Sequence, residues 1–294
     1  MKIIVGTRKS QIPLLQSRYV AKLLEQAGGE VEIHPIQTVV DSLDVALSGE
    51  GGSQMFVKEI DEALKKGEID VAVHDMKDVG IRLPSGISMA AVSAREDPRE
   101  AFISIRAGKL QALSKGSRIG VTSRTRHIQI AKLRPDLLII PIPAEVEGCL
   151  RSLKEEKVDA VVLASCDFIR MGFGKLVAEF IPVDKIIPEV GQGALSIQVR
   201  TDEKELLGFV KAACHNNACG VQVRAERSFL KAVESFDGVF AANAEIRPAG
   251  VFLIGFIASS DGSVFVTDKE SGPVDKAADI GISLAKKLLK KFPA

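Results

Sequence analysis

Apolar and polar residues along the first part of the chain follow two periods, one typical of strands and one typical of helices. Residues 2–6 and 70–74 are short apolar runs that predict buried strands, and residues 31–36 alternate as a half-buried strand does. Residues 14–24 and 56–64 carry apolar side chains at helical spacing. This alternation of strands and helices predicts a mostly parallel sheet with helices on both faces.

The same rhythm returns in the middle of the chain. Strands are predicted at residues 118–121, 137–142 and 159–163, and helices at residues 123–133 and 146–153. Ser123 is a suitable N-cap for the first of these helices. A further strand, at residues 194–199, follows a glycine-rich turn. We therefore expect two doubly wound α/β domains, joined by two crossings, that form a hinged cleft.

The pattern changes after about Cys214. A helix is predicted at residues 221–233, followed by alternating strands at 239–246, 251–258 and 264–268 and a closing helix at 277–289. This order of elements predicts a small C-terminal α+β domain. The predicted fold class is thus α/β, with two doubly wound domains around a cleft and a small α+β domain after them.

Composition narrows the classes of partner. The formal net charge of the 294 residues is +1, and there is no Trp and a single Tyr, so neither a nucleic acid nor an anionic membrane is expected as a partner. No apolar run approaches the roughly 18 residues of a membrane span. Four cysteines fit neither a zinc pattern nor a disulfide framework, so we expect no metal and reduced thiols in a cytoplasmic protein.

Three polar turns lie at the carboxyl ends of predicted strands, where ligands bind in such sheets. They carry the cations Arg8, Lys77 and Arg126 and the hydroxyl donors Ser10 and Ser123. The arginine fork suits carboxylates because it can bind both oxygens. The turns therefore predict a site for a small anionic molecule, although solvated surface charge would give the same spacing.

Seven blocks, in this order and spacing, resemble the hydroxymethylbilane synthase (porphobilinogen deaminase) family. The blocks are Gly6-Thr7-Arg8-Lys9-Ser10, Phe56-Val57-Lys58-Glu59, Val73-His74-Asp75-Met76-Lys77-Asp78-Val79, Arg95-Glu96-Asp97-Pro98-Arg99, Arg134-Pro135-Asp136-Leu137, Val190-Gly191-Gln192-Gly193-Ala194-Leu195 and Ala225-Glu226-Arg227-Ser228-Phe229-Leu230. Each block alone is weakly specific, but together they identify the chain as a diverged member.

The resemblance implies a fold and a reaction. The first two domains would be a periplasmic-binding-protein-like pair, formed by residues 1–93 with 188–210 and by residues 94–187, and residues 211–294 would form the third. The family is a transferase of porphyrin and heme biosynthesis that condenses porphobilinogen units, with loss of ammonia, into a linear tetrapyrrole. Its chain grows on a dipyrromethane cofactor held by a thioether to a cysteine of the third domain. A monomer is expected.

Part of the family's machinery is matched residue by residue. Asp78 matches the catalytic carboxylate, which stabilises the positive charge that develops as each aminomethyl group leaves. The matched substrate- or cofactor-binding residues are Arg8, Ser10, Lys77, Ser123, Arg126, Arg170 and Gln192, and Phe56 matches a phenylalanine of the family's mobile loop.

Other positions depart from the family's pattern. Four basic side chains are replaced, at Ser53, Thr125, Pro143 and Cys149, and four acids stand where the family has neutral groups or sulfur, at Asp75, Glu145, Asp167 and Asp237. Asp237 takes the place of the cysteine that holds the cofactor, and a carboxylate cannot form that thioether. Each lost charge-assisted hydrogen bond weakens binding of a carboxylate-rich chain by about 1.5–3 kcal/mol.

Three functions stay open on this evidence. The first is an active hydroxymethylbilane synthase with an altered cofactor arrangement, in which Cys149 could hold a pyrrole. The second is a non-polymerising paralogue that binds a smaller or less anionic ligand. The third, suggested by the fold alone, is a solute-binding module.

Overall fold

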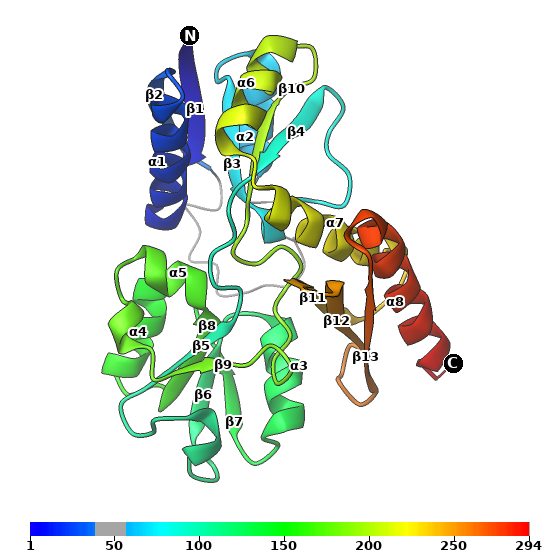
Figure 1. Cartoon of the computed structure of the whole chain (residues 1–294). Coiled ribbons are helices and arrows are strands. Elements are labelled where there is room, and N and C mark those ends of the chain that lie inside the picture. Colours follow the sequence, from blue (N-terminus) through cyan, green and yellow to red (C-terminus); the bar gives the residue numbers. More distant parts are fainter. Residues whose placement is uncertain (39–56, 294) are drawn as a thin grey trace. The chain divides into compact units, whose positions relative to one another are not determined.

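The computed structural model describes residues 1–38 and 57–293, which divide into two compact units (Figure 1). Unit 1 contains residues 1–38, 57–96 and 193–223, and unit 2 contains residues 97–192 and 224–293. The chain therefore leaves unit 1 once and returns to it once before it ends in unit 2. The three-domain boundaries stay a prediction.

Unit 1 is built on a five-stranded sheet with the order β2-β1-β3-β10-β4. Its strands are β1 (Lys2–Arg8), β2 (Glu30–Ile36), β3 (Val71–Asp75), β4 (Ile87–Val92) and β10 (Leu195–Arg200). Strands β2, β1 and β3 are parallel, whereas β10 runs antiparallel to both β3 and β4. The expectation of a mostly parallel sheet is thus confirmed, and β10 is the one strand of this sheet that runs in the opposite direction, as it belongs to the returning segment.

Helices cover both faces of this sheet. Helices α1 (Gln11–Gln26) and α6 (Lys204–Cys214) pack on one face, where Val20 and Val210 meet Ile197 of β10. Helix α2 (Lys58–Lys66) packs on the other face, where Ile60 lies in one cluster with Ala72 of β3. Because side chains alternate along a strand, Ile197 points to the first face and its neighbour Gln198 to the second.

Unit 2 contains a second five-stranded sheet, in which an antiparallel strand again lies fourth, with the order β7-β6-β8-β5-β9. The strands are β5 (Glu100–Ser104), β6 (Arg118–Val121), β7 (Leu138–Pro141), β8 (Ala160–Ala164) and β9 (Glu179–Ile181). Strand β6 is parallel to β7 and β8, and β5 is antiparallel to β8 and β9. The helices that follow β6, β7 and β8 are α3 (Arg124–Leu133), α4 (Val146–Lys154) and α5 (Ser165–Arg170).

Unit 2 also holds an antiparallel sheet of β11 (Val239–Arg247), β12 (Gly250–Ala258) and β13 (Phe265–Gly272). Helix α8 (Ala277–Lys291) lies along one face of it (Figure 1), and Ile128 of α3 packs on the other face against Phe256. Helix α7 (Asn217–Ala232) begins in unit 1 and continues in unit 2. Four single-turn helices complete the described elements: η3 (Met76–Asp78), η4 (Leu110–Ala112), η5 (Gly174–Leu176) and η6 (Val274–Lys276).

The predicted fold class is confirmed. Two doubly wound sheets and one small α+β layer are present, and most predicted elements lie within a few residues of their observed bounds. Among the described helices, none is long and apolar enough to cross a membrane.

Candidate functional site

The first group of predicted site residues lies where β1 and β3 end in unit 1. These strands are parallel neighbours, so Arg8 and Asp75, their last residues, lie at one edge of the sheet. Ser10 occupies the N-cap position of α1 but makes no capping hydrogen bond with its side chain. Its buried hydroxyl has no hydrogen-bond partner among the residues that the structure describes. Ser10 is therefore suited to bind a ligand oxygen beside Arg8.

The turn after β3 holds Lys77 and Asp78 in a fixed geometry. The amide of the buried Met76 donates to the carbonyl of Ala194 at 2.9 Å and anchors the turn to the segment before β10. Asp75 Oδ1 accepts from the Lys77 amide at 3.4 Å, and Asp75 Oδ2 lies 3.8 Å from Lys77 Nζ. Asp78 ends this short helix as a half-buried carboxylate.

Asp75 also adds a negative charge at this edge of the sheet. Its side chain is nearly buried, and its Oδ2 accepts from Gln16 Nε2 of α1 at 3.3 Å. The negative charge is thereby held close to the Lys77 ammonium. A substrate carboxylate at Lys77 has to compete with Asp75.

The second group lies in unit 2 and centres on Arg126, in the first turn of α3. Arg126 donates from Nε to Glu100 Oε2 at 2.8 Å, from Nη1 to Thr122 Oγ1 at 2.8 Å and from Nη2 to Gln192 Oε1 at 3.0 Å. Gln192 in turn donates from Nε2 to Glu100 Oε1 at 3.0 Å and to the Pro98 carbonyl at 2.7 Å. Arg126, Glu100 and Gln192 thus form a closed, buried triad that fixes the turn before β10.

The triad is charge-balanced. Burial alone would lower the pKa of Arg126, but the negative charges of Glu100, Glu189 and Asp167 outweigh burial and raise this pKa above its ordinary value. The side chain of Arg126 is only 5% exposed. Arg126 is therefore a permanent cation whose strongest described contact is a carboxylate of the protein itself. Ser123, whose Oγ accepts from the Arg126 amide at 3.3 Å, caps this helix as predicted.

A second cation in unit 2 also faces an acid. Arg170 Nη1 lies 3.6 Å from Asp167 Oδ1, on the short helix α5, and both side chains are largely buried. The thiol of Cys166 lies 3.8 Å from the same Asp167 oxygen. Asp167, one of the acids that the sequence predicts in place of neutral groups, therefore reduces the positive charge that Arg170 presents.

The remaining departures from the expected pattern lie around α3 and α4. Thr125 is half-buried, and its carbonyl accepts from Gln129 at 3.3 Å. Glu145 is exposed before α4 and Pro143 is half-buried. Cys149, on α4, is fully buried, and its Sγ donates to the Pro143 carbonyl at 3.3 Å. Ser53 and Phe56 lie outside the described residues.

Burial raises the pKa of the Cys149 thiol to about 12, an effect that Arg126 opposes and Glu145 and Asp167 reinforce. Cys149 is thus a protonated, enclosed thiol, and such thiols are poor nucleophiles. This environment argues against Cys149 as a point of attachment for a pyrrole.

The raised pKa of Cys149 predicts a pH dependence of stability. Below pH 9 the thiol holds its proton in both states, but between pH 9.0 and about 12 only the unfolded state loses it. Unfolding is therefore favoured in that window, by about 1.4 kcal/mol per pH unit. In urea titrations, Cys149→Ala is expected to be about 1 kcal/mol less stable than the wild type at pH 7 because of the cavity. This difference in the free energy of unfolding should close and reverse by pH 10.5, where the wild type becomes the less stable protein. A difference that stays constant with pH would contradict the burial of this thiol.

Sequence reasoning did not predict the acids and amides that hold these groups. Glu100 was missed as the partner of Arg126, and Gln16 as a partner of Asp75. Glu226 was noted only as part of a block, yet its buried carboxylate accepts from the amides of Gly191 and Ala244, both at 2.7 Å. A carboxylate within an apolar strand, as Glu100 is, was the one available signal of a buried ion pair.

Comparison with known proteins gives one consistent result. Residues 3–208 match the model of the dipyrromethane cofactor-binding domain of porphobilinogen deaminase. A porphobilinogen deaminase of Geobacter sulfurreducens is 42% identical over 292 residues, which cover 98% of this chain and 91% of that protein. A porphobilinogen deaminase of Geobacter metallireducens is 43% identical and covers 97% of this chain and 90% of its own length.

The chain belongs to the porphobilinogen deaminase family.

Solved structures give a weaker likeness. A periplasmic substrate-binding protein of an ABC transporter from Coxiella burnetii matches with a TM-score of 0.46 and 16% identity, over 74% of this chain and 93% of that one. A likeness of this size carries no conclusion about a ligand.

The residues present do not fit a thioether-bound dipyrromethane, the group that the family implies. Asp237, which the sequence predicts at the position of the attachment cysteine, is an exposed carboxylate just before β11. Its neighbour Phe236 packs edge-on against Phe292, with ring centroids 4.9 Å apart. All four cysteines of the chain, at 149, 166, 214 and 219, are buried thiols.

Proposed function

We propose that this protein acts on porphobilinogen in tetrapyrrole biosynthesis, condensing porphobilinogen units with loss of ammonia, and that it does so without a covalently held primer. The observation that carries the proposal is the turn of Lys77 and Asp78, which Met76 anchors to the segment before β10. The identity with porphobilinogen deaminases across 98% of the chain supports the same activity.

Asp78 is the proposed catalytic residue. In the substrate the bond from the methylene carbon to the amino nitrogen breaks, and the nitrogen leaves with the electron pair as ammonia. The remaining methylene-pyrrole carries a positive charge, which a nearby carboxylate anion stabilises as it develops. A carbon of the next pyrrole then forms the new carbon–carbon bond and loses its proton.

Binding of the acetate and propionate groups is assigned to the matched polar residues. Arg8, Ser10 and Lys77 would serve in unit 1, and Ser123, Arg126 and Arg170 in unit 2, with Gln192 holding Arg126 in place. Arginine and lysine provide charge-assisted hydrogen bonds to carboxylates. The proposed partner is this small molecule alone, in a cytoplasmic monomer without nucleic acid, membrane or metal.

A second candidate, a non-polymerising protein that binds a smaller or less anionic ligand, is favoured by three ion pairs. Lys77 lies beside Asp75, Arg126 beside Glu100, and Arg170 beside Asp167. Each pair reduces the attraction for a substrate carboxylate, and a growing chain of pyrroles would bring many carboxylates. The proposal of polymerisation therefore depends on how far substrate displaces these acids.

The two candidates predict different results with porphobilinogen and purified protein. The proposed activity predicts consumption of porphobilinogen with release of one ammonia for each carbon–carbon bond formed, which is about three for every four units joined. Asp78→Asn is expected to lower kcat by about 100-fold or more, because it removes the charge and keeps the shape. Saturable binding without ammonia release would establish the second candidate, and neither binding nor release would exclude both.

Asp75→Ser is the matched variant, since it removes the charge that competes for Lys77 and leaves Asp78 unchanged. It is expected to lower KM for porphobilinogen several-fold, by about 1 kcal/mol of electrostatic attraction. An unchanged KM would show that Lys77 does not bind the substrate.

A further inference from the structure

A buried polar layer lies between α2 and the sheet of unit 1, apart from the proposed site residues. His74 of β3 and Ser196 and Gln198 of β10 lie on the face of the sheet that α2 covers, and Asp61 of α2 lies on the helix side of this layer. His74 Nε2 lies 3.0 Å from Asp61 Oδ1, and both side chains are nearly inaccessible. Burying polar groups between a helix and a sheet destabilises the folded state unless each group has a hydrogen-bond partner. A polar atom of this layer that lacks one therefore needs an explanation.

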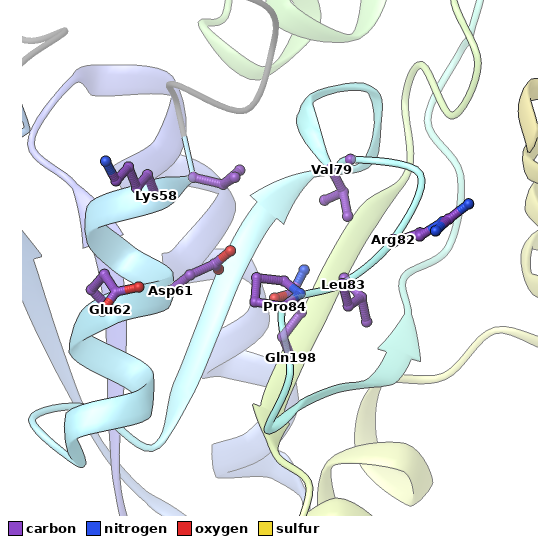
Figure 2. A pocket seen from close by; sticks show the side chains of 10 residues that line it. Lys58, Asp61, Glu62, Val79, Arg82, Leu83, Pro84 and Gln198 are labelled. Atoms are coloured by element: carbon purple, nitrogen blue, oxygen red, sulfur yellow. The ribbon is translucent and has the colours of Figure 1, made fainter. Parts of the chain in front are cut away.

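A cavity of about 160 Å³ opens beside this layer (Figure 2). Asp61 and Gln198 line it, and Val57, Val79, Leu83 and Pro84 form its apolar walls. Figure 2 shows the Asp61 carboxylate extending towards this partly open space, whereas Lys58 and Arg82 extend away from it. A cavity of about 150 Å³ accommodates a molecule the size of benzene.

The Gln198 carbonyl oxygen is the unusual atom in this cavity. Gln198 is 1% exposed, and its Nε2 donates to Ser196 Oγ at 3.1 Å. Its Oε1 accepts no hydrogen bond from any residue that the structure describes. Unsatisfied buried acceptors destabilise a folded protein, and native proteins contain few of them. A donor from outside the described chain would remove this penalty.

We propose that this cavity binds a small primary amine, as its ammonium ion, with an apolar body about the size of a benzene ring. An ammonium group has three hydrogen-bond donors and no acceptor, which suits a cavity whose polar lining consists of the Asp61 carboxylate and the Gln198 amide oxygen. The apolar walls contact the body of the ligand. The Asp61 carboxylate gives the site its preference for a positive charge over a neutral donor.

Benzylamine is the probe, with benzyl alcohol and benzoate as the neutral and anionic comparisons. In isotope-labelled wild-type protein, benzylamine is expected to shift the methyl resonances of Val57, Val79 and Leu83 in a saturable way. Benzyl alcohol and benzoate should bind about tenfold more weakly or not at all. Equal binding of the alcohol, preferred binding of benzoate, or no saturable shift would each overturn the proposal.

Gln198→Leu removes the acceptor at nearly constant volume and should weaken benzylamine about tenfold. Without ligand its Tm should change by only a few degrees, because the variant loses the hydrogen bond to Ser196 Oγ but no longer buries an unsatisfied oxygen. Glu62→Gln is the control, since Glu62 lines the same cavity but pairs with Lys65 at 3.2 Å. Benzylamine affinity should stay within about twofold of the wild type in this control. Unchanged benzylamine affinity in Gln198→Leu would contradict the proposed role of the Gln198 oxygen. If Gln198→Leu does not fold, the methyl shifts of the wild-type protein decide whether the cavity binds benzylamine.

Discussion

Arg126→Met should lower the free energy of unfolding by about 3–5 kcal/mol, the largest effect expected of any single change in the triad. The substitution leaves the Glu100 carboxylate, which is 1% exposed, without the guanidinium that lies 2.8 Å from it. It also leaves Gln192 Oε1 and Thr122 Oγ1 without their described donor. Urea unfolding at pH 7, followed by far-UV circular dichroism, measures the loss.

The double variant Arg126→Met with Glu100→Gln separates charge from packing. Since the amide that replaces the carboxylate at position 100 carries no charge, the double variant is expected to recover about 2 kcal/mol or more relative to Arg126→Met alone. Additive losses would mean that the two side chains are not coupled. In that case Arg126 could leave Glu100 and bind a substrate carboxylate at little energetic cost.

Glu226→Ala should destabilise the protein by about 3–5 kcal/mol, since it leaves two buried amides, of Gly191 and Ala244, without an acceptor. The carboxylate joins the turn that carries Gln192 to the first strand of the antiparallel sheet. Glu226→Gln keeps one acceptor oxygen and should lose about half as much.

Amide hydrogen exchange tests the same contact locally. The amides of Gly191 and Ala244 should exchange faster in Glu226→Gln, whereas that of Ala242, which lies on the same strand, should change little. Equal acceleration along β11 would point to general loosening and contradict a specific role for Glu226.

Much of the fold could be predicted because the central strands and helices have clear local patterns. Residues 118–121 and the helix that Ser123 caps were predicted at their observed bounds. Strand β5 was missed because Glu100 interrupts its apolar pattern, and its buried position depends on an arginine 26 residues away. The direction of β10 was also missed, since the hydrophobic pattern of a strand is the same in both directions.

The site could be predicted in its residue types but not in its pairing. Arg8, Lys77 and Arg126 were expected at strand ends, where the structure has them. The acidic partner of Arg126, Glu100, lies 26 positions away in the sequence, whereas Asp75 is only two residues from Lys77. Arg170 and Asp167 lie three residues apart on one helix, so local spacing is compatible with their pairing. The pairing of Arg126 with Glu100 joins separate elements and became apparent only in the structure.

The proposed absence of a covalent primer rests on Asp237, a carboxylate at the position expected to hold the cofactor, and on the burial of all four cysteines. Intact-mass spectrometry of the native protein, purified from cells that make porphobilinogen, tests it most directly. We expect the mass of the unmodified chain, 31.5 kDa. A heavier species that carries pyrroles on any side chain, and that persists after denaturation, would contradict it.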